Sequence, residues 1–202
     1  MKVGFILECT PQGPDAAIYT YLAKHFCNDL EILKPETLSS KTGVMEQGAD
    51  VAKTLLDTGC DYVFIIWDRM PKWGGTGRCE DHIATLENSL QQVGADRAKI
   101  FLCCISDMLE SWLIADGRGI DAWIASKTNH PMPGFGDHKT PATQTSPKER
   151  IKSYLQQNFP KWKYKDFENN FDILKHIPEF SRVANWNDSF RFFKERVEAI
   201  CP

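Results

Sequence analysis

The sequence lacks the cysteine and histidine spacings that mark metal-binding or redox modules. None of its seven cysteines forms a C-x-x-C pair, and several lie in or beside apolar runs. This pattern is typical of buried free thiols, so we expect thiols rather than disulfides. His82, His130 and His138 also lack the spacing of metal ligands. We therefore expect no zinc site.

A strong charge and a long apolar run are also missing. The chain has 24 basic and 27 acidic residues and a net charge of −3. No global field draws it onto nucleic acid or anionic lipid, so any such contact must be local. No apolar run approaches the roughly 18 residues of a membrane span, and residues 3–7 are too short a run for a signal peptide. These absences predict a cytoplasmic protein.

The apolar pattern that is present alternates between strands and helices. Short apolar runs at residues 3–7, 30–34, 62–67 and 99–105 predict strands, and helical spacing occupies residues 15–28, 44–56 and 80–93. The run at 62–67 is apolar at every position, as in a strand covered on both faces. The sequence predicts an α/β fold with a mostly parallel sheet and helices on both faces.

The composition changes after this region. Residues 108–115 and 120–126 predict two more helices, whereas residues 127–147 have the proline, glycine, serine and threonine content of a loop. Helical spacing returns from residue 147 onward. We predict an α/β core at 1–126, a long loop at 127–147 and a helical C-terminal extension at 148–202, packed on the core.

Two acidic residues follow buried strands of the predicted sheet. Glu8 follows the first strand and Asp68 follows the strand at residues 62–67. Ligands of parallel α/β sheets bind beyond the carboxyl ends of the strands, and Mg²⁺ favours carboxylate oxygens. The alternative is that each carboxylate caps the next helix.

A third acidic group follows the strand at residues 99–105. Asp107 and Glu110 are three residues apart, which places them on one side of a first helical turn. Asp107 is predicted to cap the helix and Glu110 to reach the site. Asp116 is favoured less, and a purely structural role stays open for both Glu110 and Asp116.

Basic residues accompany two further segments. Arg69, Lys72 and Arg78 surround the glycine-rich stretch 74–77, which lacks the lysine and spacing of a Walker motif. The stretch is either a flexible loop or a phosphate-contacting flap with Trp73 available to stack on a base. Lysines also surround Trp162 and Tyr164, as a solvated helix face or a nucleic-acid contact.

Several motifs together resemble a known family. They are F-I-L-E at residues 5–8 with G-P-D-A-A at 13–17, I-I-W-D at 65–68, and L-E-S-W-L-I-A-D at 109–116, with P-K-E-R at 147–150 and D-S-F-R-F-F at 188–193. The chain is similar to the TOPRIM-related bacterial family known as domain of unknown function 4276, over nearly its whole length.

The resemblance implies a TOPRIM-like fold that binds Mg²⁺ or Mn²⁺ for phosphoryl-transfer chemistry on nucleic acid. By position it implies that Glu8 and Asp68 are the metal-binding catalytic residues. From their place after the strand at 99–105, we add Glu110 as a third catalytic residue and metal ligand and Asp107 as a further metal ligand. Arg69, Lys72 and Arg78 would contact phosphate. It also implies an AAA-type or ABC-type ATPase partner in phage-defence loci, and a homo-oligomer stays open.

The chain departs from the family pattern at two positions. Met70 replaces the second aspartate of the D-x-D motif, and Cys9 replaces the glycine after the glutamate. Losing one carboxylate weakens a second metal site most. Glu110, Asp107 or Asp15 could substitute.

Three hypotheses follow from the residues and the resemblance. The first is a Mg²⁺-dependent nuclease, and the second is a catalytically degenerate subunit that acts through a partner ATPase. The third is an enzyme that processes a nucleotide or another phosphate compound at the same edge.

Overall fold

The computed structural model describes residues 1–75, 77–128, 134–137 and 146–202. The chain forms two compact units, of which the first comprises Met1–Ile105 and Phe192–Pro202 and the second Ser106–Arg191. These units divide the chain differently from the predicted boundaries at 126 and 147. Most of the predicted loop at 127–147, including His130 and His138, lies outside the described residues.

The first unit is built on a parallel sheet. β1 (Lys2–Leu7) pairs with β4 (Tyr62–Asp68), which pairs with β5 (Ile100–Ile105), and the sheet order is β2-β1-β4-β5. Every recorded ladder is parallel. The predicted α/β fold with a mostly parallel sheet is confirmed.

The edge beside β1 consists of two short strands. β2 (Glu31–Ile32) and β3 (Glu36–Thr37) both pair with β1, at its two ends. Pro35 stands between them and has no backbone N–H to donate to a ladder. The single strand predicted at 30–34 is therefore interrupted.

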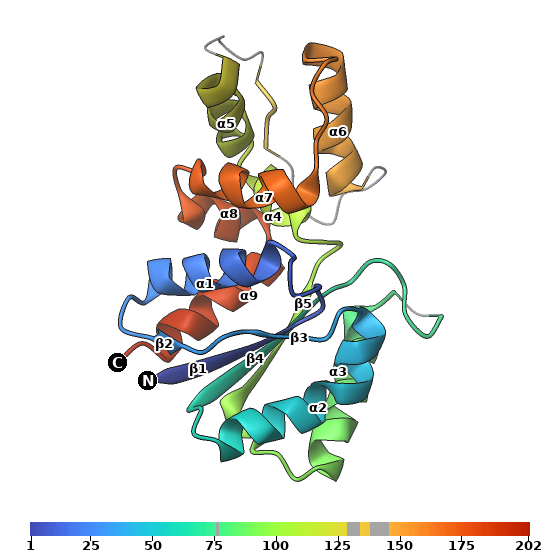
Figure 1. Cartoon of the computed structure of the whole chain (residues 1–202), viewed down its shortest axis with the longest axis vertical. Coiled ribbons are helices and arrows are strands. Elements are labelled where there is room, and N and C mark those ends of the chain that lie inside the picture. Colours follow the sequence, from blue (N-terminus) through green and yellow to red (C-terminus); the bar gives the residue numbers. More distant parts are fainter. Residues whose placement is uncertain (76, 129–133, 138–145) are drawn as a thin grey trace. The chain divides into compact units, whose positions relative to one another are not determined.

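Helices cover both faces of this sheet (Figure 1). α1 (Asp15–Phe26) and the end of α9 (Asp188–Ala199) lie on one face, where Phe193 packs 6.4 Å from Phe5 and 5.7 Å from Phe64 between ring centroids. α2 (Lys41–Asp57) and α3 (Cys79–Gln92) lie on the other, where Ile65 and Trp67 join their core. Successive residues of β4 thus face opposite helical layers. Because both layers bury the strand, an apolar side chain is favoured at each position.

The second unit is helical. Its bounds are α4 (Glu110–Ala115), α5 (Arg118–Thr128), α6 (Pro147–Asn158), α7 (Asp166–Lys175), α8 (Phe180–Trp186) and the start of α9. Ser146 caps α6 by accepting a hydrogen bond from Glu149 N at 3.2 Å, and Pro147 fits the first turn, which needs no N–H donor. Within the parts of the chain that are described, no helix has both the length and the apolar content needed to cross a membrane.

Candidate functional site

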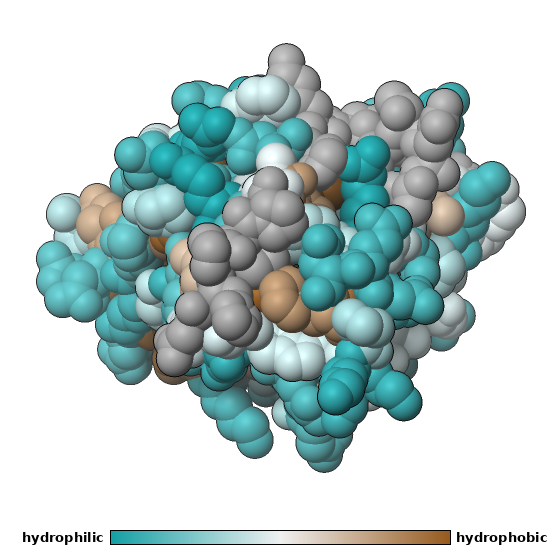
Figure 2. Space-filling view, turned by 90° about the horizontal axis from the view of Figure 1, so that it is seen from above, coloured by the Kyte–Doolittle hydropathy of each residue, from teal (hydrophilic) through white to brown (hydrophobic). Residues whose placement is uncertain are grey.

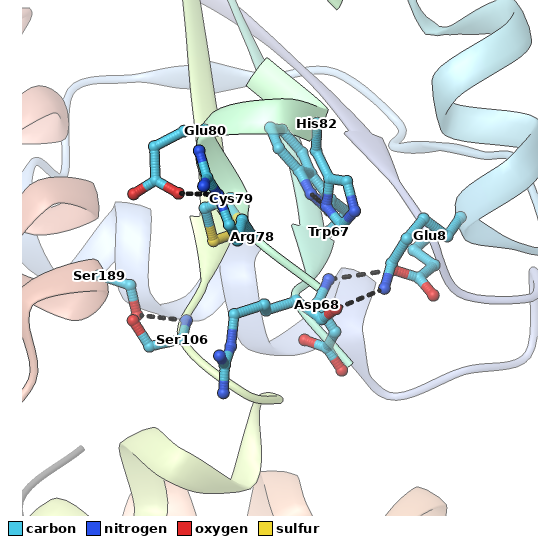
Figure 3. The surroundings of a disulfide bond; sticks show 12 residues. Glu8, Trp67, Asp68, Arg78, Cys79, Glu80, His82, Ser106 and Ser189 are labelled. Atoms are coloured by element: carbon cyan, nitrogen blue, oxygen red, sulfur yellow. Dashed lines mark hydrogen bonds and ion pairs between the residues drawn. A yellow bond between two sulfur atoms is a disulfide. The ribbon is translucent and has the colours of Figure 1, made fainter. Parts of the chain in front are cut away.

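Glu8 and Asp68 lie beside each other at the carboxyl edge of the sheet. Leu7 pairs with Ile66 across β1 and β4, so the residues that follow reach the edge together. The backbone N–H of Asp68 donates to Glu8 Oε2 at 3.0 Å. Figure 3 shows this pair at the end of β4. The structure therefore brings together the first two acidic residues that the sequence predicted.

These two residues line one cavity of the first unit, with a volume of about 260 Å³. Asp15, the first residue of α1, also lines it and adds a third carboxylate. The remaining walls are Cys9, Thr10, Tyr19, Ser39, Ile66 and Trp67. Asp15, one of the three substitutes that the sequence analysis proposed, thus lies in the same cavity as Glu8 and Asp68.

Lys41 is a buried cation next to the two carboxylates. It is the first residue of α2, and its Nζ donates to Arg69 O at 2.9 Å and also to Pro71 O. Only 5% of Lys41 is exposed, and its charge interacts with both Glu8 and Asp68. The sequence analysis missed this residue. The sequence did contain one signal, which is a lysine where the first turn of α2 forms. A positive charge there is disfavoured by the helix dipole, so its presence indicates an interaction elsewhere.

Burial shifts the ionisation of both Glu8 and Lys41. It raises the pKa of Glu8, although the Lys41 ammonium and two backbone hydrogen bonds act in the opposite direction. It lowers the pKa of Lys41, against the attraction of Glu8 and Asp68. Each group pays for desolvation and is partly compensated by the other.

Cys9 is not an activated nucleophile. Burial and the neighbouring Asp15 raise the pKa of its thiol to about 12. A thiol with this pKa is protonated at neutral pH, and the thiolate is the reactive form. The cavity therefore offers carboxylate chemistry rather than thiol chemistry.

The loop after β4 carries the predicted phosphate contacts. Its start is fixed, since Arg69 N donates to Ile105 O at 2.9 Å, and a cis peptide bond joins Met70 to Pro71. Lys72 is exposed. Arg78 lies 3.4 Å from a carboxylate oxygen of Asp81 at the start of α3.

Trp73, predicted to be available to a base, packs instead at the core. Its ring meets His82 edge-on at 6.0 Å between centroids. His82 is buried and accepts a hydrogen bond from Trp67 Nε1 at 3.2 Å. Trp73 is thus a partly buried core residue in this structure.

A disulfide joins the end of this loop to the sheet. Cys79, the first residue of α3, bonds to Cys104 of β5, and a second disulfide joins Cys27 to Cys201. Figure 3 shows Cys79 near the end of β4, with the Trp67 and His82 pair. The expectation of free thiols is wrong for these four cysteines, because their partners come together only in the fold. It is confirmed for buried Cys60 and Cys103.

Glu110 and Asp107 lie in the second unit. The buried Glu110 carboxylate accepts from Tyr164 Oη and Asn170 Nδ2, both at 3.2 Å. Asp107 is buried with a φ of 69°, and Leu109 stands at the N-cap of α4, so the prediction that Asp107 caps this helix is wrong. The predicted metal roles of Glu110 and Asp107 stay predictions.

Asp116 is a structural residue of the second unit. Its side chain is fully buried, and its Oδ2 accepts from Arg118 Nη2 at 2.7 Å. The buried carboxylate is thereby neutralised by a guanidinium group, as a buried charge requires.

Across the described residues, no three His, Cys, Asp or Glu side chains are grouped closely enough to hold a metal ion. The cavity carboxylates thus do not form a complete cage. Mg²⁺ sites often use one or two carboxylates and complete the coordination with water and substrate phosphate. Glu8 and Asp68 fit that description.

Comparisons with protein-family models, with curated proteins and with solved structures find no match to this chain.

Proposed function

We propose that the chain is a Mg²⁺-dependent nuclease of TOPRIM-like type that cleaves phosphodiester bonds at the Glu8 and Asp68 edge. One observation carries the proposal. Glu8, Asp15 and Asp68 line a single cavity where parallel strands end. This edge is where α/β sheets bind their ligands.

The charge of the cavity supports a divalent cation. Three carboxylates line it, and the Lys41 ammonium, which also interacts with the Arg69 guanidinium, lies beside them. A phosphate group would be repelled by this excess of negative charge unless a cation lay between them. Glu8 and Asp68 would hold Mg²⁺, or Mn²⁺ in its place. When bound, the ion would stabilise the negative charge that develops on the phosphate.

The chain's own residues have distinct roles in this proposal. Glu8 is the candidate ligand of the ion or, alternatively, the candidate general base, and burial raises its pKa above the ordinary value, which favours proton acceptance. Asp68 is the principal ligand. Lys41 fixes the start of the loop through two carbonyl oxygens and supplies one positive charge. Arg69 and Lys72 follow Asp68 along the chain and would steady the phosphate.

A degenerate subunit acting through an AAA-type or ABC-type ATPase is the second candidate. Two features favour it. Met70 stands where the family pattern has its second aspartate, and Lys41 already provides a cation to both carboxylates. Because the Lys41 ammonium already offsets part of the negative charge of Glu8 and Asp68, the two carboxylates would bind a metal ion less strongly. Under this alternative the cavity would have a structural role.

The cytoplasmic location also stays a proposal. The cysteine pattern no longer supports it, because disulfides such as Cys27 to Cys201 persist mainly in oxidising compartments. A fractionation of the native host with antibodies to the chain would test the location directly.

The decisive experiment is cleavage of labelled single-stranded and double-stranded DNA and RNA with Mg²⁺, Mn²⁺ or EDTA. Glu8→Gln and Asp68→Asn should each lower the rate roughly 100-fold, the scale of losing a group that stabilises transition-state charge. Glu46→Gln, an exposed change on α2, is the matched control and should keep full activity. Equal cleavage by the Glu8→Gln, Asp68→Asn double variant would refute the proposal. Cleavage only with a co-purified ATPase would favour the alternative.

A further inference from the structure

The second unit contains a cavity of its own, with a volume of about 360 Å³. It lies between the second half of α6 and the segment that leads from α6 to α7. Its walls combine two lysines, an amide and two aromatic rings: Lys152, Gln156, Pro160, Trp162, Lys163 and Tyr164. Its size lies at the lower end of the range for small-ligand sites, so it suits a group of nucleotide size.

The indole of Trp162 is held in place by its neighbours. A turn forms after α6, where Trp162 N donates to Phe159 O at 2.8 Å. The indole then meets Trp123 edge-on at 5.9 Å and lies 5.7 Å from the Phe159 ring, between centroids. Trp162 stays only half-buried. A fixed, partly exposed indole provides a stacking surface without the entropic cost of ordering it.

Tyr164 is anchored on the same segment. Its hydroxyl donates to Glu110 Oε1 at 3.2 Å and also contacts Asn170 Oδ1. Burial and the Glu110 carboxylate raise the pKa of Tyr164 far above its ordinary value, so the ring stays neutral. Glu110 and Asn170 thus fix the wall of the cavity through Tyr164.

The two lysines bring positive charge to this aromatic wall. Lys152 pairs with the exposed Glu149 at 2.7 Å, and the structure records no ion pair for Lys163 among the residues it describes. Lys161 and Lys165 continue the alternation of lysine with aromatic residues along the segment. Figure 2, seen from the side on which α5 and α6 lie, shows a mainly hydrophilic surface with a small hydrophobic area near its centre.

We propose that this cavity binds one nucleotide unit of a single-stranded nucleic acid, with a base against Trp162 and phosphate near Lys152 and Lys163. Aromatic stacking and a positively charged groove are the two elements of sequence-independent single-strand binding. A duplex is excluded from this mode, because its bases are stacked on each other and present no free face. The site belongs to the second unit alone, so it goes beyond the nuclease proposal and does not depend on it.

The test is fluorescence anisotropy of a labelled 12-nucleotide oligothymidine with the full chain in EDTA. A 12-base-pair duplex and free thymidine monophosphate serve as competitors. Single strand should bind, and both competitors should displace it poorly. Lys152→Gln with Lys163→Gln should weaken binding and reduce the slope of log K against log salt by about 0.7, for one phosphate contact on a single strand.

Trp162→Leu should weaken binding on the order of tenfold, as expected for one lost stacking contact. The lysine variant covers the case in which Trp162→Leu fails to fold. The matched control is Lys175→Gln, because Lys175 is exposed on α7 and pairs with Asp172 outside the cavity. It should bind like the wild type.

The proposal is overturned if the double lysine variant binds oligothymidine with unchanged affinity and salt slope. The proposal would also be overturned if the duplex bound as tightly as the single strand. Binding of the free monophosphate by a protein that does not bind the oligonucleotide would overturn it as well. The Glu8→Gln, Asp68→Asn variant separates the two proposals. It should lose cleavage and keep this binding, whereas the cavity variants should lose binding in EDTA, where no cleavage occurs.

Discussion

The carboxylate of Glu8 accepts a hydrogen bond from the backbone N–H of Asp68, at 3.0 Å between Asp68 N and Glu8 Oε2. One residue follows β1 and the other ends β4, so this bond joins two strand ends. Glu8 therefore has a structural role in addition to any chemical one.

Two substitutions of Glu8 separate these roles. Glu8→Gln keeps an oxygen that can accept from Asp68 N and should unfold at nearly the wild-type urea concentration. Glu8→Ala leaves that N–H without its acceptor and should lose about 1–2 kcal/mol of stability. Both should cleave roughly 100-fold more slowly than the wild type. Equal stability of the two variants would show that the bond contributes little.

Lys41→Met should weaken the site and the fold together. It removes two hydrogen bonds from a buried ammonium, to Arg69 O and Pro71 O, and a cation beside Glu8 and Asp68. We expect a loss of about 2–3 kcal/mol in urea unfolding, since bonds to charged groups are the stronger ones. Lys53→Met removes only an exposed pair with Asp57 and should cost less than about 1 kcal/mol. Similar losses would contradict the role of Lys41.

The affinity for Mg²⁺ should rise with pH. The pKa of Glu8 lies above its ordinary 4.5 because of burial, and the ion must displace the proton. Calorimetry in buffers of different ionisation enthalpy should detect proton release on binding. In the metal-free protein, the raised pKa of Glu8 increases the free energy of unfolding at pH values below the pKa that Glu8 has in the unfolded chain. This contribution is lost as the pH rises through the pKa that Glu8 has in the folded protein.

The control for this experiment is Glu8→Gln, which cannot titrate at this position. Its weaker binding should depend less on pH and release fewer protons. A wild-type affinity that stays constant as pH passes through the acidic range would contradict the role of Glu8 as a ligand.

The thiols offer a direct count. Denatured but unreduced protein should titrate three of its seven cysteines, which are Cys9, Cys60 and Cys103. After reduction all seven should react. Seven reactive thiols before reduction would show that neither disulfide had formed.

The two disulfides should differ in their contributions to stability. The Cys27 and Cys201 pair spans 174 residues and the Cys79 and Cys104 pair 25. The chain-entropy relation gives about 5 and about 3.5 kcal/mol for loops of these lengths. Replacing each pair by serine should reproduce this order in urea unfolding, and a reductant should not affect the variant that lacks both pairs.

Two glycines of α2 form a matched test of the helix that carries Lys41. A Cβ at Gly43 would lie 2.3 Å from Leu38 O, whereas one at Gly48 would meet nothing closer than 3.6 Å. Gly43→Ala should therefore destabilise the protein by about 2 kcal/mol or more. Gly48→Ala should stabilise it by about 0.5–1 kcal/mol, because alanine is the better helix former. The reverse order in thermal unfolding would contradict this packing.

The sheet was predictable because its determinants are local. The run at 62–67 is apolar throughout, and the structure covers β4 on both faces, as expected. Glu8 and Asp68 were found from their places after strands. Lys41 and the disulfides were not, because each depends on partners brought close only by folding. Asp15 was predicted only as one possible replacement for the missing second aspartate, because no local pattern places its side chain at the cavity.

The division into units was also out of reach of the sequence. Helical spacing predicts α9, but nothing in the spacing shows that Phe193 packs against Phe5 and Phe64. This packing joins the end of the chain to strands that precede it by more than a hundred residues. A pattern read along the chain assigns all of 148–202 to one extension, whereas the contacts divide it at residue 192.

This discontinuity has a consequence for biosynthesis. The first unit needs the residues after Arg191 to complete the aromatic layer over β1 and β4. During translation, Phe5 and Phe64 of the nascent sheet therefore stay incompletely covered until all of Ser106–Arg191 has been synthesised. At about 5–20 residues per second this interval lasts several seconds, during which an exposed apolar face is a natural target for chaperones.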